Sequence, residues 1–315
     1  MIKNLERCDS GFRGSENENC LWIKCVDPSQ EEIDLLKTKY GIPTDYIYDA
    51  LDPYESARGE NILQMKDGTA ALIMLLYPVE VKYHDYPTFE TRPISMICKD
   101  NTVITVTKDD ADFFETPLKD REFRIQEAES AESLVLELAW KISQRYIETV
   151  KILAQQRITL ENSLRNDTDA DSLYQVMSIQ KGNLNLEDGI DQNRPVIDEL
   201  RRSPKMYTSE HTEELIHDLI VENRQGQYMV SKSSRMVQQL SQTYQNVIST
   251  NLNVVMKVQT SISIILVLPT IVAGYWGMNV LLPIAGAKYA FLAMLGISGV
   301  LCGIAYAIFK KMDYL

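Results

Sequence analysis

The chain has 315 residues and a formal net charge of −12, which leaves room for a soluble domain and further segments. Such an acidic surface repels nucleic acid and anionic lipid and attracts cations, although an acidic surface that only keeps the domain soluble explains the total equally well. The scattered cysteines contain no Cys-x-x-Cys pair and predict reduced thiols, without a disulfide framework or a zinc cage. They are Cys8, Cys20, Cys25, Cys98 and Cys302.

Residues 1–120 are predicted to form a cytoplasmic α/β domain. Residues 1–19 show little apolar periodicity, and we expect a loose arm with at most one short strand. Residues 20–26 are typical of a strand, and a helix should begin near Ser29 and end before Gly41. A second short helix is expected over residues 43–52.

Four runs rich in β-branched and large apolar residues predict further strands. They cover residues 61–65, 70–81, 93–98 and 102–107, with turn sequences between them. The region holds no Gly-rich phosphate loop, no Gly-x-Ser-x-Gly and no His-Glu-x-x-His motif. The sequence therefore gives no indication of an enzyme.

Residues 121–206 are predicted to form a helical segment of the same cytoplasmic domain. Apolar residues recur every three to four positions from Leu134 onward, which predicts a long amphipathic helix over residues 131–166. A second helix should begin at Asp169 or Asp171. We expect Asn193-Arg194-Pro195 to interrupt it, with one short helical piece before Ser203-Pro204.

A stalk helix is predicted over residues 207–257, with Thr208 or Ser209 as its cap, and it can continue to Trp276 despite Pro269. Ser233, Leu240, Val247 and Val254 recur every seven residues and indicate a packing stripe. No acidic residue lies between Glu222 and Met256, whereas an exposed helix normally carries both signs of charge. We infer a helix buried among copies of itself, around a wet but uncharged centre.

Two apolar segments, residues 258–276 and 289–309, each approach the ~20 residues that cross a bilayer. An outer loop over residues 277–288 would join them, and residues 310–315 would form a tail. From Lys257 onward there are four lysines and one aspartate, a net +3, which leaves −15 for residues 1–256. Lys257, Lys310 and Lys311 outnumber Lys288, so a multi-pass protein of the cell membrane (inner or plasma), with both termini cytoplasmic, is predicted.

One face of the first span is not uniformly apolar. Small and hydroxylated side chains on a membrane helix permit either close helix packing or a water-filled path, and both interpretations stay open here. The residues of this face are Met256, Gln259, Thr260, Ser263, Val267, Thr270 and Gly274.

The first span ends in Tyr275-Trp276-Gly277-Met278-Asn279. Gly277 can adopt backbone angles closed to other residues and so can end a membrane helix and turn the chain. Asn279 offers an uncharged amide oxygen, which suits a hydrated divalent cation.

A Tyr-x-Gly-Met-Asn corner that closes the first of two C-terminal membrane helices, after a long acidic domain, resembles the CorA family of divalent-cation (magnesium) channels. The resemblance implies an α+β cytoplasmic domain with a mixed sheet, a long stalk helix, two transmembrane helices and a homopentameric funnel. It implies that Gly277, Met278 and Asn279 hold hydrated Mg²⁺ at the outer entrance. The polar face named above would then line the pore, with Val267 and Met256 as constrictions.

The resemblance also implies regulation by cytoplasmic Mg²⁺ bound at acidic pairs between subunits. The candidates are Asp218 or Glu222 on the stalk, with Glu80 or Asp85 from the sheet region. The alternative for each is a solvated acid.

Two features depart from the family pattern. The corner is followed by residues 280–288 without any acid, whereas most members carry one that helps to attract cations, and Gln259 lies where the cytoplasmic constriction is usually apolar. A transporter of zinc, cobalt or nickel is therefore an alternative to a magnesium channel. A membrane-anchored cation sensor or scaffold without flux is another.

Overall fold

The structure, a computed structural model, describes residues 2–8, 11–14, 20–64, 68–111, 130–163, 170–278, 288–312 and 314. The chain divides into two compact units, Met1–Ser241 and Gln242–Leu315. Each unit is described by itself, and helix α5 contributes residues to both.

The first unit contains a seven-stranded mixed sheet. Its order is β2-β1-β3-β7-β6-β5-β4, and every neighbouring pair is antiparallel except β3 and β7. The strands are β1 (Ile2–Cys8), β2 (Gly11–Gly14), β3 (Trp22–Val26), β4 (Arg58–Glu60), β5 (Ala71–Tyr83), β6 (Tyr86–Lys99) and β7 (Thr102–Thr107). The helices of the chain are α1 (Gln30–Tyr40), α2 (Asp45–Leu51), α3 (Ala131–Ser163), α4 (Ala170–Arg202), α5 (Glu210–Trp276) and α6 (Ala290–Lys311), with 3-10 turns η1 (Ile62–Gln64) and η4 (Pro204–Met206).

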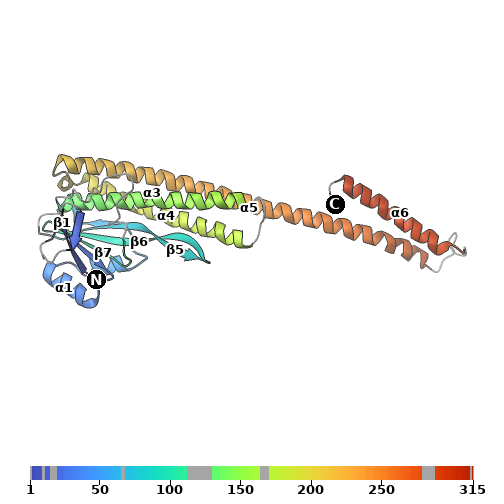
Figure 1. Ribbon diagram of the computed structural model, residues 1–315, viewed down its shortest axis with the longest axis horizontal. Coiled ribbons are helices and arrows are strands. Elements are labelled where there is room, and N and C mark those ends of the chain that lie inside the picture. The colour runs from blue at the N-terminus through green and yellow to red at the C-terminus, as the bar shows by residue number, and fades with distance from the viewer. Residues whose placement is uncertain are drawn as a thin grey trace. The chain divides into compact units, whose positions relative to one another are not determined.

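The sheet lies between two layers of helices, as Figure 1 shows. On one face α1 and α2 bury a core with the strands, in which Ile23, Leu36 and Ile47 are fully enclosed. Helices α3 and α4 pack on β5 and β6. Because both faces are covered, residues 71–78 of β5 form a continuous buried run and do not alternate. The predicted α+β fold with a mixed sheet, a long helix and a final apolar helix is confirmed.

The ends of α1 follow directly from the sequence. Ser29 and Glu32 form a capping box, in which Ser29 Oγ accepts from the Glu32 N–H at 3.3 Å and Glu32 Oε2 accepts from the Ser29 N–H at 2.8 Å. The bond from the Ser29 backbone lowers the pKa of the Glu32 carboxyl. Gly41 ends the helix in the left-handed conformation at φ 60°, which favours glycine. Both predicted ends are confirmed.

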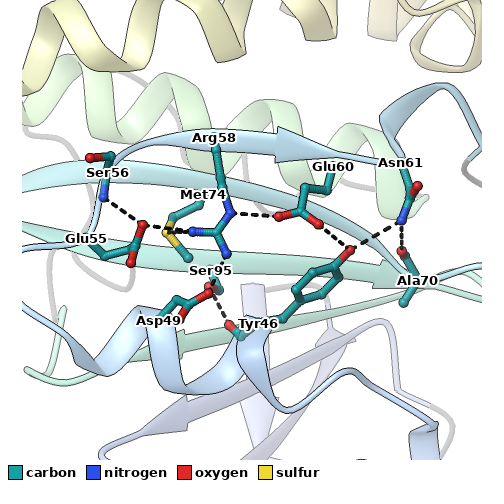
Figure 2. A network of polar contacts seen from close by, with 10 residues as sticks. All are labelled: Tyr46, Asp49, Glu55, Ser56, Arg58, Glu60, Asn61, Ala70, Met74 and Ser95. Carbon is teal, nitrogen blue, oxygen red and sulfur yellow. Dashed lines mark hydrogen bonds and ion pairs between the residues drawn. The ribbon is translucent and has the colours of Figure 1, made fainter.

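A polar network around Arg58 fixes α2 to the edge of the sheet (Figure 2). The Arg58 guanidinium donates to Asp49 of α2, to Glu55 at 2.9 Å and to Glu60 of β4 at 2.7 Å. Tyr46 Oη in turn donates to Glu60 at 3.0 Å. Burial, together with this bond to Glu60, raises the pKa of Tyr46 to about 12. One cation thus holds three carboxylates from a helix, a loop and a strand.

Two predictions for the N-terminal half are wrong. The first residues contain two strands, β1 and β2, because β1 pairs with both β2 and β3 and so extends the sheet. The strand predicted over residues 61–65 is not found in its described part, since residues 62–64 form the turn η1. Asn61 has φ 57°, a conformation that asparagine tolerates and that ends strand pairing after Glu60.

The predicted break in the second long helix is also wrong. Helix α4 runs without interruption through Pro195. An internal proline removes one hydrogen bond and costs about 3 kcal/mol, but Val196, Ile197 and Leu200 beyond it are almost fully buried. Tertiary packing therefore holds the helix together. Helix α3 begins at the predicted residue 131, and Asp169 lies outside the described residues.

Helix α5 is continuous over 67 residues, through Pro269, as predicted. Ser209 precedes it and accepts from the N–H of Thr212 at 3.3 Å, in the predicted capping position. Part of the expected heptad stripe is buried within the first unit, because Ser233 is 6% exposed and Leu240 is 5% exposed. In the second unit, by contrast, Val254 is 52% exposed.

Candidate functional site

The second unit places the predicted polar face of α5 on the outside. Met256 is 61% exposed and Val267 is 49% exposed, and a Cβ added to Gly274 would meet no atom within 4 Å. The whole set is exposed in the single chain, namely Met256, Gln259, Thr260, Ser263, Val267, Thr270 and Gly274. The structure thus brings the predicted residues together on one free surface.

The opposite face of α5 is more enclosed. Ser261 is 1% exposed, and Val258, Ile265 and Val272 are partly buried. Helix α6 reaches this side, where Cys302 Sγ donates to the Ile265 carbonyl at 3.5 Å. Sequence reasoning did not single out this second stripe. Its spacing of three, four and seven residues was the available signal.

The polar side chains of the free face differ in how they are satisfied. Ser263 Oγ donates to the Gln259 carbonyl at 2.9 Å, and Thr270 Oγ1 donates to the Val267 carbonyl at 2.7 Å. These hydroxyls keep acceptor lone pairs for other partners. The exposed Gln259 side chain makes no hydrogen bond with any described residue. The Gln259 amide therefore needs hydrogen-bond partners from outside the single chain more than the two hydroxyl groups do.

The corner after α5 is described only as far as Met278. The Gly277 N–H donates to the Ala273 carbonyl at 2.9 Å, which adds one more helical bond beyond Trp276. Among the described glycines, Gly41 and Gly68 have positive φ, and Gly277 does not. The helix ends where expected, but Gly277 does not use the conformational freedom that we expected of it. Met278 is 53% exposed, and Asn279 lies outside the described residues.

The four candidate regulatory acids lie in the first unit, two on α5, one on β5 and one in the turn that follows β5. Glu222 of α5 accepts a hydrogen bond from Gln144 Nε2 of α3, and Asp218 lies 3.8 Å from His217 Nδ1. Glu80 lies opposite Phe89 in the β5–β6 pair, and Asp85 occupies the turn between these strands with φ 68°. In the part of the chain that the structure describes, no three His, Cys, Asp or Glu side chains gather as metal ligands.

Two described helices, Glu210–Trp276 and Ala290–Lys311, are long and apolar enough by length and composition to cross a membrane. Among the described cysteines, Cys25, Cys98 and Cys302 are in the thiol form. Burial raises the pKa of the Cys25 thiol to about 12 and that of Cys98 well above its usual range.

Comparison with known proteins gives similarity over nearly the whole chain. The cobalt/magnesium transport protein CorA of Methanocaldococcus jannaschii is 21% identical over 304 residues, which are 95% of this chain and 93% of that protein. The complete structure of the CorA magnesium transporter from the same organism has a TM-score of 0.76 at 20% identity, covering 100% of this chain and 99% of that one.

Two further structures share the fold. The full-length CmaX protein has a TM-score of 0.69 at 17% identity, covering 99% of this chain and 97% of that one. The cytoplasmic domain of ZntB from Vibrio parahaemolyticus has a TM-score of 0.54 at 12% identity, covering 80% of this chain and 98% of that one. Because residues 17–311 match the family described as CorA-like Mg²⁺ transporter protein, this chain belongs to that family of membrane ion transporters, which are not enzymes.

Proposed function

We propose that this protein conducts divalent cations across the cell membrane, with Mg²⁺ as the principal ion, through a pore formed by five copies of the chain. The observation that supports this most directly is the free polar face of α5. In lipid, an exposed Gln259 amide would lose hydrogen bonds that water supplies. Copies of the chain arranged around a water-filled path would place this face, and Gln259 with it, in contact with water and ions.

The path would begin at Gly277, Met278 and Asn279. Asn279 of each copy would offer its amide oxygen to a cation that keeps its hydration shell, since Mg²⁺ dehydrates reluctantly. The ion would then pass Gly274, Thr270 and Ser263, whose hydroxyl and backbone oxygens can accept hydrogen bonds from its water.

Apolar constrictions would gate the path. Val267 and Met256 would close it by narrowing and drying. Gln259 lies three residues from Met256 and would keep the cytoplasmic constriction wetter than an apolar residue would. Both termini would lie in the cytoplasm, where the membrane potential draws cations inward at about 2.3 kcal/mol per elementary charge per 100 mV.

Mg²⁺ in the cytoplasm would also regulate the channel. Asp218 or Glu222 of one copy, paired with Glu80 or Asp85 of its neighbour, would hold the ion and keep the stalks closed. The support is that, in the part of one chain that the structure describes, no three His, Cys, Asp or Glu side chains gather as metal ligands, which favours a site shared with a second copy. In the single chain the Glu222 carboxylate already accepts a hydrogen bond from Gln144. A bound ion would have to break this hydrogen bond or use the free lone pairs of the same carboxylate.

The proposal is tested by uptake into liposomes that contain the purified protein and a magnesium-sensitive dye, with zinc measured in parallel. Voltage-dependent Mg²⁺ entry that Asn279→Ala abolishes would support it. Asn162→Ala, the same chemical change on the exposed side of α3, is the matched control and should leave uptake unchanged.

Other outcomes would assign a different function. Zinc entry driven by a proton gradient, without Mg²⁺ entry, would identify a zinc transporter, and the same assay with cobalt and nickel covers those ions. No flux of any ion, from protein that is assembled and folded, would favour a sensor or scaffold.

A further inference from the structure

We propose that a groove between α4 and α5 in the Met1–Ser241 unit binds a phosphate group, carried either by inorganic phosphate or by a nucleotide. The groove encloses a cavity of about 110 Å³. This arginine groove is lined by Arg194, Ile197 and Asp198 of α4 and by Ile220, Asn223, Arg224 and Gln227 of α5. It takes no part in the proposed ion path.

Two side-chain amides in the arginine groove have unused hydrogen-bonding capacity. Asn223 is only 4% exposed, yet its side chain makes no hydrogen bond with any residue that the structure describes. Gln227 Nε2 is also buried without a hydrogen-bond partner in the described structure. Buried amide groups are nearly always hydrogen-bonded, because leaving one unpaired costs roughly 1–3 kcal/mol. A ligand with acceptor oxygens would satisfy both.

The charge of the groove selects an anion. Arg194 and Arg224 face it from opposite helices and form no ion pair within the described parts of the chain. Asp198 also lines the groove, but its carboxylate lies 3.3 Å from the Arg201 guanidinium, which offsets its charge. The two arginines that line the groove outweigh its one carboxylate, although the chain as a whole carries −12.

The arrangement of donors favours phosphate over a carboxylate. Two arginines and two amides contribute from both walls, so the donors approach the ligand from more than two directions. A carboxylate has two oxygens, whereas a phosphate group has three or four and can accept from every donor at once. Planar guanidinium groups also bind phosphate through two parallel hydrogen bonds.

A neighbouring cavity of about 390 Å³ shares Ile220 with the arginine groove. Tyr207, Ile216 and His217 are among its lining residues. An aromatic ring and apolar side chains next to a phosphate site offer a surface on which a nucleobase can stack. The source of the phosphate group is therefore decided by comparing inorganic phosphate with ATP.

The test is calorimetric titration of the full-length protein in detergent with inorganic phosphate and, separately, with ATP. A chelator removes divalent cations, and the ionic strength is held constant. We expect saturable binding, weakened about tenfold or more by Arg194→Gln, Arg224→Gln and Asn223→Ala. Arg235→Gln removes the same charge from an exposed position of α5 outside the groove and should change the affinity less than twofold.

The two arms identify the source of the phosphate. Similar affinities indicate the free anion, whereas ATP binding at least tenfold tighter indicates a nucleotide. The proposal fails if neither ligand binds saturably, or if Arg235→Gln weakens binding as much as Arg224→Gln does. It also fails if the groove variants disassemble the oligomer while phosphate does not bind, because the arginines would then contact a second copy. No ion flux is needed for any of these readouts, so failure of the proposed channel function leaves the test intact.

Discussion

The side chain of Asn193 pairs with the backbone of Leu76 in β5, just beyond Arg58, the first residue of β4. Its Oδ1 accepts from the Leu76 N–H at 2.7 Å, and its Nδ2 donates to the Leu76 carbonyl at 2.7 Å. β4 pairs with β5 only as far as Met74, and backbone groups two residues further along a strand point to the same side. One side chain from α4 thus completes the hydrogen bonding of a buried strand edge.

Asn193→Leu should therefore lower the free energy of unfolding by about 1–3 kcal/mol, the cost of leaving a buried backbone group unpaired. In the variant, Tyr146 Oη still donates to the Leu76 carbonyl at 3.1 Å. The unpaired Leu76 N–H therefore accounts for most of the lost stability. Thermal unfolding of the full-length protein measures it. Leu184→Ala, at a position 52% exposed on the same helix, is the control and should change stability by no more than about 0.5 kcal/mol. Equal melting temperatures for the two variants would contradict this account.

The same asparagine shows why part of the fold could not be predicted from the sequence. Asn193, Arg194 and Pro195 favour a turn locally, and local preference was the only signal available. The contact that overrides it joins residues 117 positions apart. The arginine groove was missed for the same reason, because Arg194 becomes part of a site only when α4 continues past it.

The features that were predicted correctly are local or strongly periodic. The capping box at Ser29, the glycine end of α1 and the apolar periodicity of α3 and α5 are each contained within a few turns. The polar face of α5 could be predicted because helical geometry alone places Thr260, Ser263 and Val267 together. Where copies of the chain meet is not contained in such periodicity, so the regulatory acids stay predictions.

Two serines of α5 allow the proposed path to be tested against the enclosed face. Ser263 is exposed, whereas Ser261, two residues away, is 1% exposed. Ser263→Leu should leave assembly and melting temperature nearly unchanged and reduce cation uptake at least tenfold, because it inserts an apolar side chain into the path. Ser261→Leu should instead destabilise the second unit by about 1–3 kcal/mol through overpacking. Liposome uptake and thermal unfolding are measured on both variants. If Ser261→Leu reduced uptake without lowering the melting temperature, and Ser263→Leu did not reduce uptake, the path would lie on the α6 side.

A substitution at Gly277 tests why this position is occupied by glycine. Its φ is not positive, and a Cβ there would lie 3.4 Å from the Ala273 carbonyl oxygen, an ordinary contact. Gly277→Ala should therefore not lower the melting temperature of the protein. If uptake is nevertheless lost, glycine is required by the assembled entrance and not by the conformation of one chain. A lower melting temperature, by contrast, would show that the corner needs a backbone that alanine resists.

Arg58→Gln should lower the free energy of unfolding by about 2 kcal/mol at neutral pH, the scale of hydrogen bonds to charged groups. The variant leaves Asp49, Glu55 and Glu60 close together without their cation. The deficit should shrink at high salt, which screens both the lost attraction to Arg58 and the repulsion among the three carboxylates. Lys181→Gln breaks an exposed pair with Glu90 and serves as the control, with an expected loss below about 1 kcal/mol. A deficit that is independent of salt would show that lost packing, rather than charge, causes it.

Asp191 provides a prediction in which removing a charge stabilises the protein. Desolvation, with the nearby Glu187 carboxylate, raises the pKa of Asp191 in the folded state, although Arg194 opposes the shift. The ionised form is therefore less favourable in the folded chain than in the unfolded one. This penalty is absent below the unfolded pKa, develops as the pH rises through the folded pKa, and is complete above it.

Asp191→Asn should accordingly raise the melting temperature at pH 7, and the gain should disappear as the pH falls below about 4, the ordinary aspartate value. Asp171→Asn makes the same chemical change in the first turn of α4, where a negative charge is favoured by the helix dipole. It should lower the melting temperature at pH 7, which gives the two variants opposite signs. If both variants shifted it in the same direction, general relief of the acidic surface, and not the surroundings of Asp191, would explain the gain.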